Sequence, residues 1–317
     1  MKPAIALQTL LAAMLVLAAG AAQAGKAPAH SDFTGIWTLG SLTELERPKA
    51  FKTLVVPDPD AKAYEKLHRN TPPDYATEDD PTHGAEAEWW ERDVGLARIR
   101  GQARSSWIVS PADGQRPENP AAKAAAKAAR LRRKTDFNGP ESRTRGERCV
   151  DTGAGPPLTN GGANDLYQFI LTGDQLVIHA EWLDDVRVAR IGDTRHPPPQ
   201  VRLVGGDSVA HWEGPTLVVE TTNFSPADVD DPKHDPNADM RTLERFTRLS
   251  DQELLYDVTV TNPAHDTQTW RAEMVFEASR KPMYEFACHE GNYALRSMLA
   301  GERRLEGRTV DGFAKGQ

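Results

Sequence analysis

Residues 210–224 read AHWEGPTLVVETTNF, which is the pattern of a β-hairpin. The turn is expected at residues 213–215, because glycine tolerates the positive φ of a tight reversal and proline ends ladder pairing on that side. In the strand that follows, Leu217, Val219 and Thr221 point to one face, and the residues between them point to the other. The stretch therefore predicts two antiparallel strands with distinct faces.

The same pattern of turn and strand occurs twice more. Gly173-Asp174 precedes QLVIHAEW, and Ser250-Asp251 precedes QELLYDVTVT. When the first leucines of the three strands are aligned, six polar residues share one face: His179, Glu181, Glu220, Thr222, Asp257 and Thr259. The opposite face carries apolar and aromatic residues: Ile178, Trp182, Val219, Tyr256, Val258 and Val260. We hypothesise that the polar face lines a hydrated cavity, with His289 and Glu290 at its mouth.

The sequence from residue 164 to 304 is almost entirely of β type. Short alternating runs are joined by tight turns without helical patterns between them, which is typical of an antiparallel barrel or sandwich. The expected strands are 166–171, 175–182, 186–191, 207–212, 216–222, 242–249, 253–261, 269–277 and 284–288. A closing helix over 292–303 and a flexible tail over 305–317 follow. The sequence therefore predicts a mainly β core with a few peripheral helices.

Residues 25–163 are expected to add one strand and a segment of loops and helices that packs on the barrel. The strand is 32–39, whose Gly35-Ile36-Trp37 resembles the start of a lipocalin barrel, where the tryptophan closes one end. A tryptophan that only packs in the core is the alternative. Helices are expected over 60–68, with Asp60 as N-cap, over 86–100, and after Asn119-Pro120. The strand 105–109 lies between the second and third of these helices.

The first 24 residues have the pattern of a secretory signal peptide. Lys2 supplies the positive charge, residues 6–19 the apolar run, and Ala22-Gln-Ala24 the cleavage site. No second apolar run of spanning length follows, so the mature chain is expected to be periplasmic or secreted, without a transmembrane segment. Removal of the signal peptide takes the formal charge from -8 to -9, because Lys2 is its one charged side chain. An acidic balance disfavours a nucleic-acid partner.

The two cysteines, Cys149 and Cys288, both lie in the exported part. In an oxidising compartment an even pair favours a disulfide over the alternative of two buried thiols. Closing a loop of this length is worth about 4 to 5 kcal/mol in the chain-entropy treatment.

Three long motifs resemble a large group of exported bacterial proteins of uncharacterised function. The motifs are WEGPTLVVETTNF at 212–224, LERFTRLSDQELLYDVTVTNP at 243–263 and YEFACHEGNYALRSMLAGER at 284–303, with IVSPADGQRP at 108–117 and RCVDTGAGPP at 148–157. The resemblance covers most of the mature chain and implies no activity. The sequence departs from the pattern at Pro215, where aspartate is expected, and this puts the turn type in question.

Four residues are candidates for acid/base catalysis. His179 and Glu181 lie on one face of one strand, about 7 Å apart, a spacing that suits two metal ligands or an acid/base pair. An exposed polar sheet face is the alternative. His289 and Glu290 follow Cys288 at the junction before the closing helix, where a disulfide would hold them rigidly. Capping of that helix by Glu290 and Asn292 is the alternative there.

The leading functional expectation is an exported protein that binds a small organic molecule, with acid/base catalysis in a polar barrel cavity as an extension. Six residues are expected to contribute to binding: Arg187, Trp212, Glu220, Asn223, Asp257 and Asn292. One alternative is a metal-assisted hydrolase or lyase, although the sequence identifies neither a metal nor a cofactor. The other is a non-catalytic envelope or interaction protein.

Overall fold

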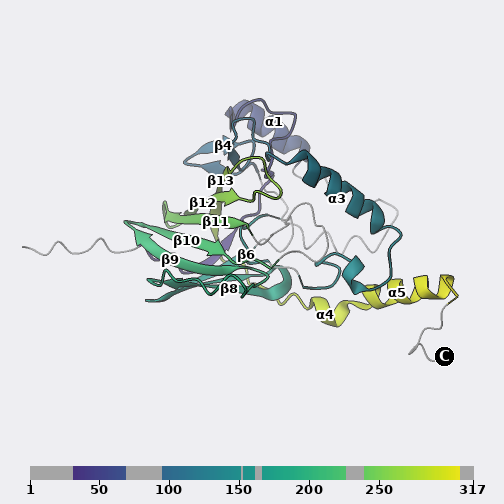
Figure 1. Cartoon of the computed structure of the whole chain (residues 1–317). Helices are drawn as coiled ribbons and strands as arrows, with labels where there is room; N and C mark the ends of the chain where they lie inside the picture. The colour runs from purple at the N-terminus through teal and green to yellow at the C-terminus, as the bar shows by residue number, and fades with distance from the viewer. Residues whose placement is uncertain (1–30, 69–94, 151–152, 161–165, 226–238, 308–317) are drawn as a thin grey trace, which may run out of the picture. The chain divides into compact units, whose positions relative to one another are not determined.

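The computed structural model describes residues 31–68, 95–150, 153–160, 166–225 and 239–307 (Figure 1). The predicted signal peptide, residues 86–94 of the expected helix and residues 308–317 of the expected tail lie outside these ranges. Within the described ranges, no helix has the length and apolar character needed to cross a membrane.

The strands and helices of the described part follow in chain order. The strands are β1 (Gly35–Thr38), β2 (Val55–Val56), β3 (Arg98–Ile99), β4 (Gln102–Arg104), β5 (Ile108–Ser110), β6 (Leu166–Leu171), β7 (Gln175–Ala180), β8 (Asp185–Ile191), β9 (Asp207–Glu213), β10 (Thr216–Thr222), β11 (Arg241–Arg248), β12 (Glu253–Thr261) and β13 (Trp270–Ser279). The helices are α1 (Asp58–His68), α3 (Pro120–Arg132), α4 (Cys288–Gly291) and α5 (Tyr293–Leu305), with 3-10 turns η1 (Pro140–Ser142) and η2 (Trp182–Asp184).

Nine of the described strands close into a barrel. The order around the barrel is β1, β6, β7, β8, β9, β10, β11, β12 and β13, and β13 pairs back onto β1 with Trp37 opposite Ala278. All neighbours are antiparallel except β8 and β9, which run parallel after the connection 192–206. The predicted mainly β barrel with peripheral helices is therefore confirmed. Because the ring is closed, each of these nine strands pairs with a neighbour on both sides, and none of them is an edge strand.

The β9–β10 hairpin has a two-residue turn. Thr216 pairs with Glu213, so only Gly214 and Pro215 lie between the strands. Gly214 has a φ of +60°, and the ring of Pro215 holds its own φ negative. A positive φ at the first turn residue alone is the signature of a type II′ turn, which fits the twist of paired strands. Proline at position 215 is therefore compatible with the hairpin.

The interior of the barrel is a packed apolar core. Leu176, Ile178, Leu217, Val219 and Val258 have no exposed surface and belong to one continuous cluster. Aromatic rings fill its centre and contact one another in pairs: Phe33, Tyr167, Phe169, Phe246, Tyr256 and Phe276. The predicted apolar face is thus the inner face. Trp182 is the exception, because it follows β7 in η2 and is 39% exposed.

The polar strand face lies on the outside of the barrel, so the hypothesis that it lines an internal cavity is wrong. Successive strand residues point to opposite sides of a sheet, and the apolar side fills the interior. Glu220 retains 38% and His179 26% of side-chain exposure. An antiparallel sheet commonly has one solvent-exposed face, where polar side chains stay hydrated and lose little free energy on folding.

A second, three-stranded sheet has the order β2, β4, β3. It shares a small apolar cluster with α1, which begins at Asp58 and not after Asp60 as predicted. The helix expected over 86–100 is wrong in its described part, because Arg98 and Ile99 form β3. Arg100 and Gly101 both have positive φ and turn the chain tightly into β4, which supplies the pairing partner.

The predicted helix starts after residues 119 and 292 are confirmed, whereas the strand expected over 284–288 is wrong. Asn119 Oδ1 accepts a hydrogen bond from Ala121 N at the start of α3, and Asn292 Oδ1 accepts one from Leu295 N at the start of α5. The backbone N–H of Tyr284 donates to the carboxylate of Glu181 instead of to a neighbouring strand. This segment therefore leaves the sheet and leads into α4.

Candidate functional site

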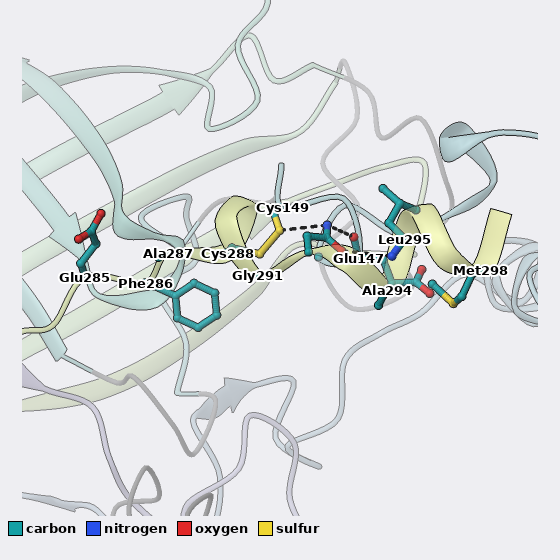
Figure 2. Close-up of a pocket in the computed structure, with 12 residues that line it drawn as sticks. Glu147, Cys149, Glu285, Phe286, Ala287, Cys288, Gly291, Ala294, Leu295 and Met298 are labelled. Atoms are coloured by element: carbon teal, nitrogen blue, oxygen red, sulfur yellow. Dashed lines mark hydrogen bonds between the residues drawn. A yellow bond between two sulfur atoms is a disulfide. The ribbon is translucent and has the colours of Figure 1, made fainter. Parts of the chain in front are cut away.

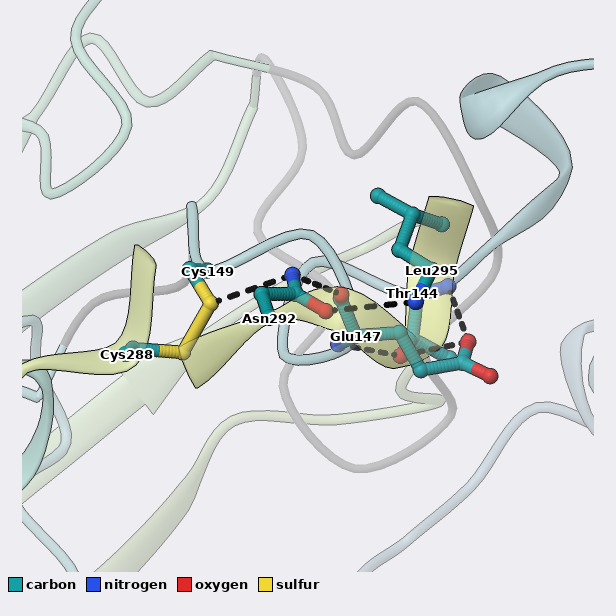
Figure 3. Close-up of a disulfide and its surroundings, with 6 residues drawn as sticks. All are labelled: Thr144, Glu147, Cys149, Cys288, Asn292 and Leu295. Carbon is teal, nitrogen blue, oxygen red and sulfur yellow. Dashed lines mark hydrogen bonds between the residues drawn. A yellow bond between two sulfur atoms is a disulfide. The ribbon is translucent and has the colours of Figure 1, made fainter. Parts of the chain in front are cut away.

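A disulfide joins Cys149 to Cys288, as predicted. The bond links residues 139 positions apart, with their Cα atoms 5.8 Å from each other, and connects the turn 144–149 to α4 (Figure 3). Cys149 has a φ of +56°, a conformation that non-glycine residues adopt at some cost and that the surrounding contacts must hold. The disulfide forms one wall of the groove described below.

The turn before Cys149 is organised around the carboxylate of Glu147. Its Oε2 atom accepts hydrogen bonds from the backbone N–H of Thr144 at 2.7 Å and from the hydroxyl of Thr144 at 3.0 Å. Arg143 Nε donates to the same oxygen at 3.4 Å. Burial alone would raise the pKa of Glu147, but these hydrogen bonds and the Arg143 charge outweigh it and lower the pKa. Glu147 is therefore a carboxylate anion at neutral pH.

Asn292 ties this turn to the closing helix. Its Nδ2 donates to the carbonyl of Glu147 at 2.8 Å and to Cys149 Sγ at 3.3 Å, while its Oδ1 caps α5 (Figure 3). Both ends of the amide are thus satisfied by the protein. Asn292 was predicted to bind a ligand or cap the helix, and the structure gives it the capping role at the edge of the groove.

A groove of about 600 Å³ lies beside the disulfide (Figure 2). Its described lining comes from the 146–149 turn, the segment before α4, and α5: Gly146, Glu147, Cys149, Glu285, Phe286, Ala287, Cys288, Gly291, Asn292, Ala294, Leu295 and Met298. Most of these side chains are apolar. Leu295 and Met298 lie three residues apart and therefore on one face of α5.

The groove contacts the barrel at the β7–β8 corner, which consists of residues 181–184 between the two strands. Glu181 is only 5% exposed, and its Oε1 accepts the Tyr284 N–H at 2.8 Å. The ring of Trp182 packs against Phe286, with centroids 4.8 Å apart. Gly153 lies directly against this corner, since an added Cβ would be 2.2 Å from the Trp182 carbonyl oxygen. The chain therefore needs glycine at this close approach.

The predicted catalytic residues do not converge on a common pocket. His179 bonds to Asp184 at 2.6 Å, and Glu181 is used to hold residue 284. His289 and Glu290 are exposed on α4. None of the four is among the described residues that line the groove.

The predicted binding residue Arg187 lies inside the barrel and is used structurally. Its guanidinium pairs with Glu244, and its Nε donates to the Ala154 carbonyl at 2.6 Å. Tyr256 donates to Glu244 at 2.8 Å and accepts the N–H of Leu158 at 3.1 Å. Burial and the Glu244 charge raise the pKa of Tyr256 well above its usual value. This network holds the segment 153–158 against the core.

The other predicted binding residues are spread over the barrel. Trp212 packs partly buried against the core, and Asp257 pairs with Arg271. Asn223, whose φ is +57°, donates from its amide to carbonyls of the 192–206 connection, including Pro197 at 3.0 Å. They form no common site with the groove.

A second cleft, of about 450 Å³, lies between the end of β8, the start of β9 and the connection that joins them. Asp207 is 7% exposed, accepts two hydrogen bonds from Arg190, and contacts His196 Nδ1 at 2.7 Å. The predicted binding residue Glu220 is 4.0 Å from His196 Nε2. Across the described residues, no group of three or more metal-ligating side chains comes together in a way that would hold an ion.

Several groove residues were not singled out from the sequence. Glu147 lies in a stretch without a recognisable periodicity, Phe286 lies in the segment expected to be a strand, and the disulfide joins their neighbourhoods across 139 positions. The apolar spacing of Leu295, Met298 and Leu299 was the available signal, because it marks an amphipathic helix. Met298 remains 36% exposed, so the apolar face of this helix is only partly covered.

No protein-family model, curated protein or solved structure matches the chain. The resemblance to an exported bacterial family therefore stays a prediction.

Proposed function

We propose that the protein is an exported binding protein that holds a small organic molecule in the groove beside the Cys149–Cys288 disulfide. The observation that carries this proposal is the groove itself, whose volume of about 600 Å³ lies within the range of small-molecule sites. Its walls are mostly apolar, with a few fixed polar groups, which is the composition that such sites have.

The frame of the groove supports binding of a defined ligand. The disulfide connects its two sides covalently, and the two hydrogen bonds from Asn292 Nδ2 to the Glu147 carbonyl and to Cys149 Sγ connect them by polar contacts. A ligand that enters a preorganised site loses less free energy to ordering of the protein. The interior of the barrel is a poorer candidate, because aromatic and aliphatic side chains fill it.

Binding is favoured over acid/base catalysis by the chemistry of the lining. The described lining residues include two glutamates and one asparagine but no histidine. Glu147 has a lowered pKa and is held by Thr144 and Arg143, so it is a poor proton acceptor near neutral pH.

The proposal is tested with a neutral apolar fluorescent probe, N-phenyl-1-naphthylamine, titrated into the exported protein. Saturable binding is expected. Met298→Glu should weaken it at least about tenfold, because a carboxylate would be placed in an apolar wall. Leu131→Glu on α3, where the leucine is 57% exposed, is the matched control and should bind like the wild type. Absence of saturable binding, or equal affinity of both variants, would refute the proposal.

A further inference from the structure

The charged side chains of the groove have one sign. Glu147 and Glu285 line it, and its described lining contains no lysine, arginine or histidine. The remaining lining is apolar or amide (Figure 2). A ligand that fits this surface needs an apolar body and positive charge.

Glu147 is placed so that half of its carboxylate is available to a ligand. The hydrogen bonds from Thr144 and Arg143 all end on Oε2. Within the described part of the chain, no hydrogen bond or ion pair reaches Oε1, and the side chain is 35% exposed. Oε1 therefore keeps its acceptor capacity, while Oε2 fixes the direction in which the group points.

Arg143 does not cancel this charge from inside the groove. Its side chain is 7% exposed and is absent from the described lining. Its Nη1 donates to the Arg133 carbonyl at 2.8 Å, and the guanidinium lies over the ring of Phe137. Glu285 is the second carboxylate of the lining, so both charged side chains among the described lining residues are negative.

Taking the proposed binding function as the basis, we infer that the ligand class is an organic monocation with an apolar body, such as an alkyl or aryl amine. The ammonium group would donate to Glu147 Oε1 in a charge-assisted hydrogen bond. The body would lie along Phe286, Leu295 and Met298.

The inference is tested with three probes that share one body: octylamine, octanol and octanoate at pH 7, each used to displace N-phenyl-1-naphthylamine. Octylamine is expected to displace it at a concentration at least about tenfold lower than octanol, with octanoate weakest. If the fluorescent probe binds but the three octyl compounds displace it equally, or octanoate is strongest, the cation inference fails and the binding function stands. If neither the fluorescent probe nor any octyl compound binds, both fail.

The Glu147→Gln variant tests whether the Glu147 carboxylate causes the preference for octylamine. The amide oxygen of glutamine can still accept from Thr144, so the turn is expected to persist while the charge is lost. The preference for octylamine over octanol should fall to near one, and Glu290→Gln, on α4 but outside the described lining, should retain it. Should Glu147→Gln prevent folding, Glu285→Gln is used and is expected to reduce the preference. A preference unchanged by the folded variant would overturn the inference.

Discussion

Arg187 and Glu244 face each other inside the barrel and are joined by two hydrogen bonds, of 2.6 Å to Oε2 and 2.8 Å to Oε1. Their side chains are 5% and 0% exposed. Burial would lower the pKa of Arg187, but the Glu244 charge outweighs it and raises the pKa. Each charge thus has its partner inside the barrel, where little water reaches either group.

Removal of one partner of this pair should cost more than removal of both. Glu244→Leu or Arg187→Met alone is expected to lower the free energy of unfolding by about 3 to 5 kcal/mol, because one charge is left buried and unpaired. The double variant should be more stable than either single variant. Urea unfolding of the wild type, the two single variants and the double variant measures these free energies. If the losses of the two single variants simply add in the double variant, the expectation is contradicted.

The disulfide should stabilise the fold and the groove together. Cys149→Ser with Cys288→Ser is expected to lower the free energy of unfolding by about 5 kcal/mol, since the bond closes a long loop in the unfolded chain. Binding of the fluorescent probe should weaken as well. Thiol titration of the denatured wild-type protein, purified without reductant, should find no free thiol, and two titratable thiols would contradict the pairing.

Asp207 should make stability depend on acid pH. Burial alone would raise its pKa, but hydrogen bonds from Arg190 and His196 outweigh it and lower the pKa. In the unfolded chain an aspartate titrates at about pH 3.9. Its stabilising contribution is therefore complete above that value and is lost as the pH falls through the lower folded pKa.

Asp207→Asn tests this dependence. The variant should be less stable than the wild type at pH 7, and the difference should shrink below about pH 4. Asp251→Asn is the control, because that side chain is 93% exposed. Thermal unfolding between pH 2.5 and 7 measures the stability of each variant relative to the wild type. If the stability difference between Asp207→Asn and the wild type does not change with pH, the role of Asp207 is contradicted.

The strands of the barrel were largely predictable, because period-two alternation is a local signal. β6, β10 and β12 have the predicted bounds, and β7 ends two residues earlier, where Glu181 adopts helical backbone angles. Alternation alone defines two faces without saying which is concave. Tyr256 lies on the predicted apolar face, and the alternation does not show that its hydroxyl has a buried partner in Glu244.

The groove was less predictable, because its parts come from distant positions. The sequence indicated the disulfide and the start of α5 at Asn292. It did not indicate that Glu181 would be buried beneath residue 284, because that contact spans 103 positions and competes with an equally plausible strand over 284–288. Long-range contacts of single side chains carry no periodicity that a sequence pattern can reveal.

The parallel pair β8–β9 has a consequence for the whole ring of strands. A closed ring in which every strand reverses the direction of its neighbour returns to its starting direction only when the number of strands is even. A ring of nine has odd parity and must contain at least one pair of equal direction. The connection 192–206 places that pair between β8 and β9: if it were shortened to a tight turn, β9 would run antiparallel to β8, and the pair of equal direction would have to lie elsewhere in the ring.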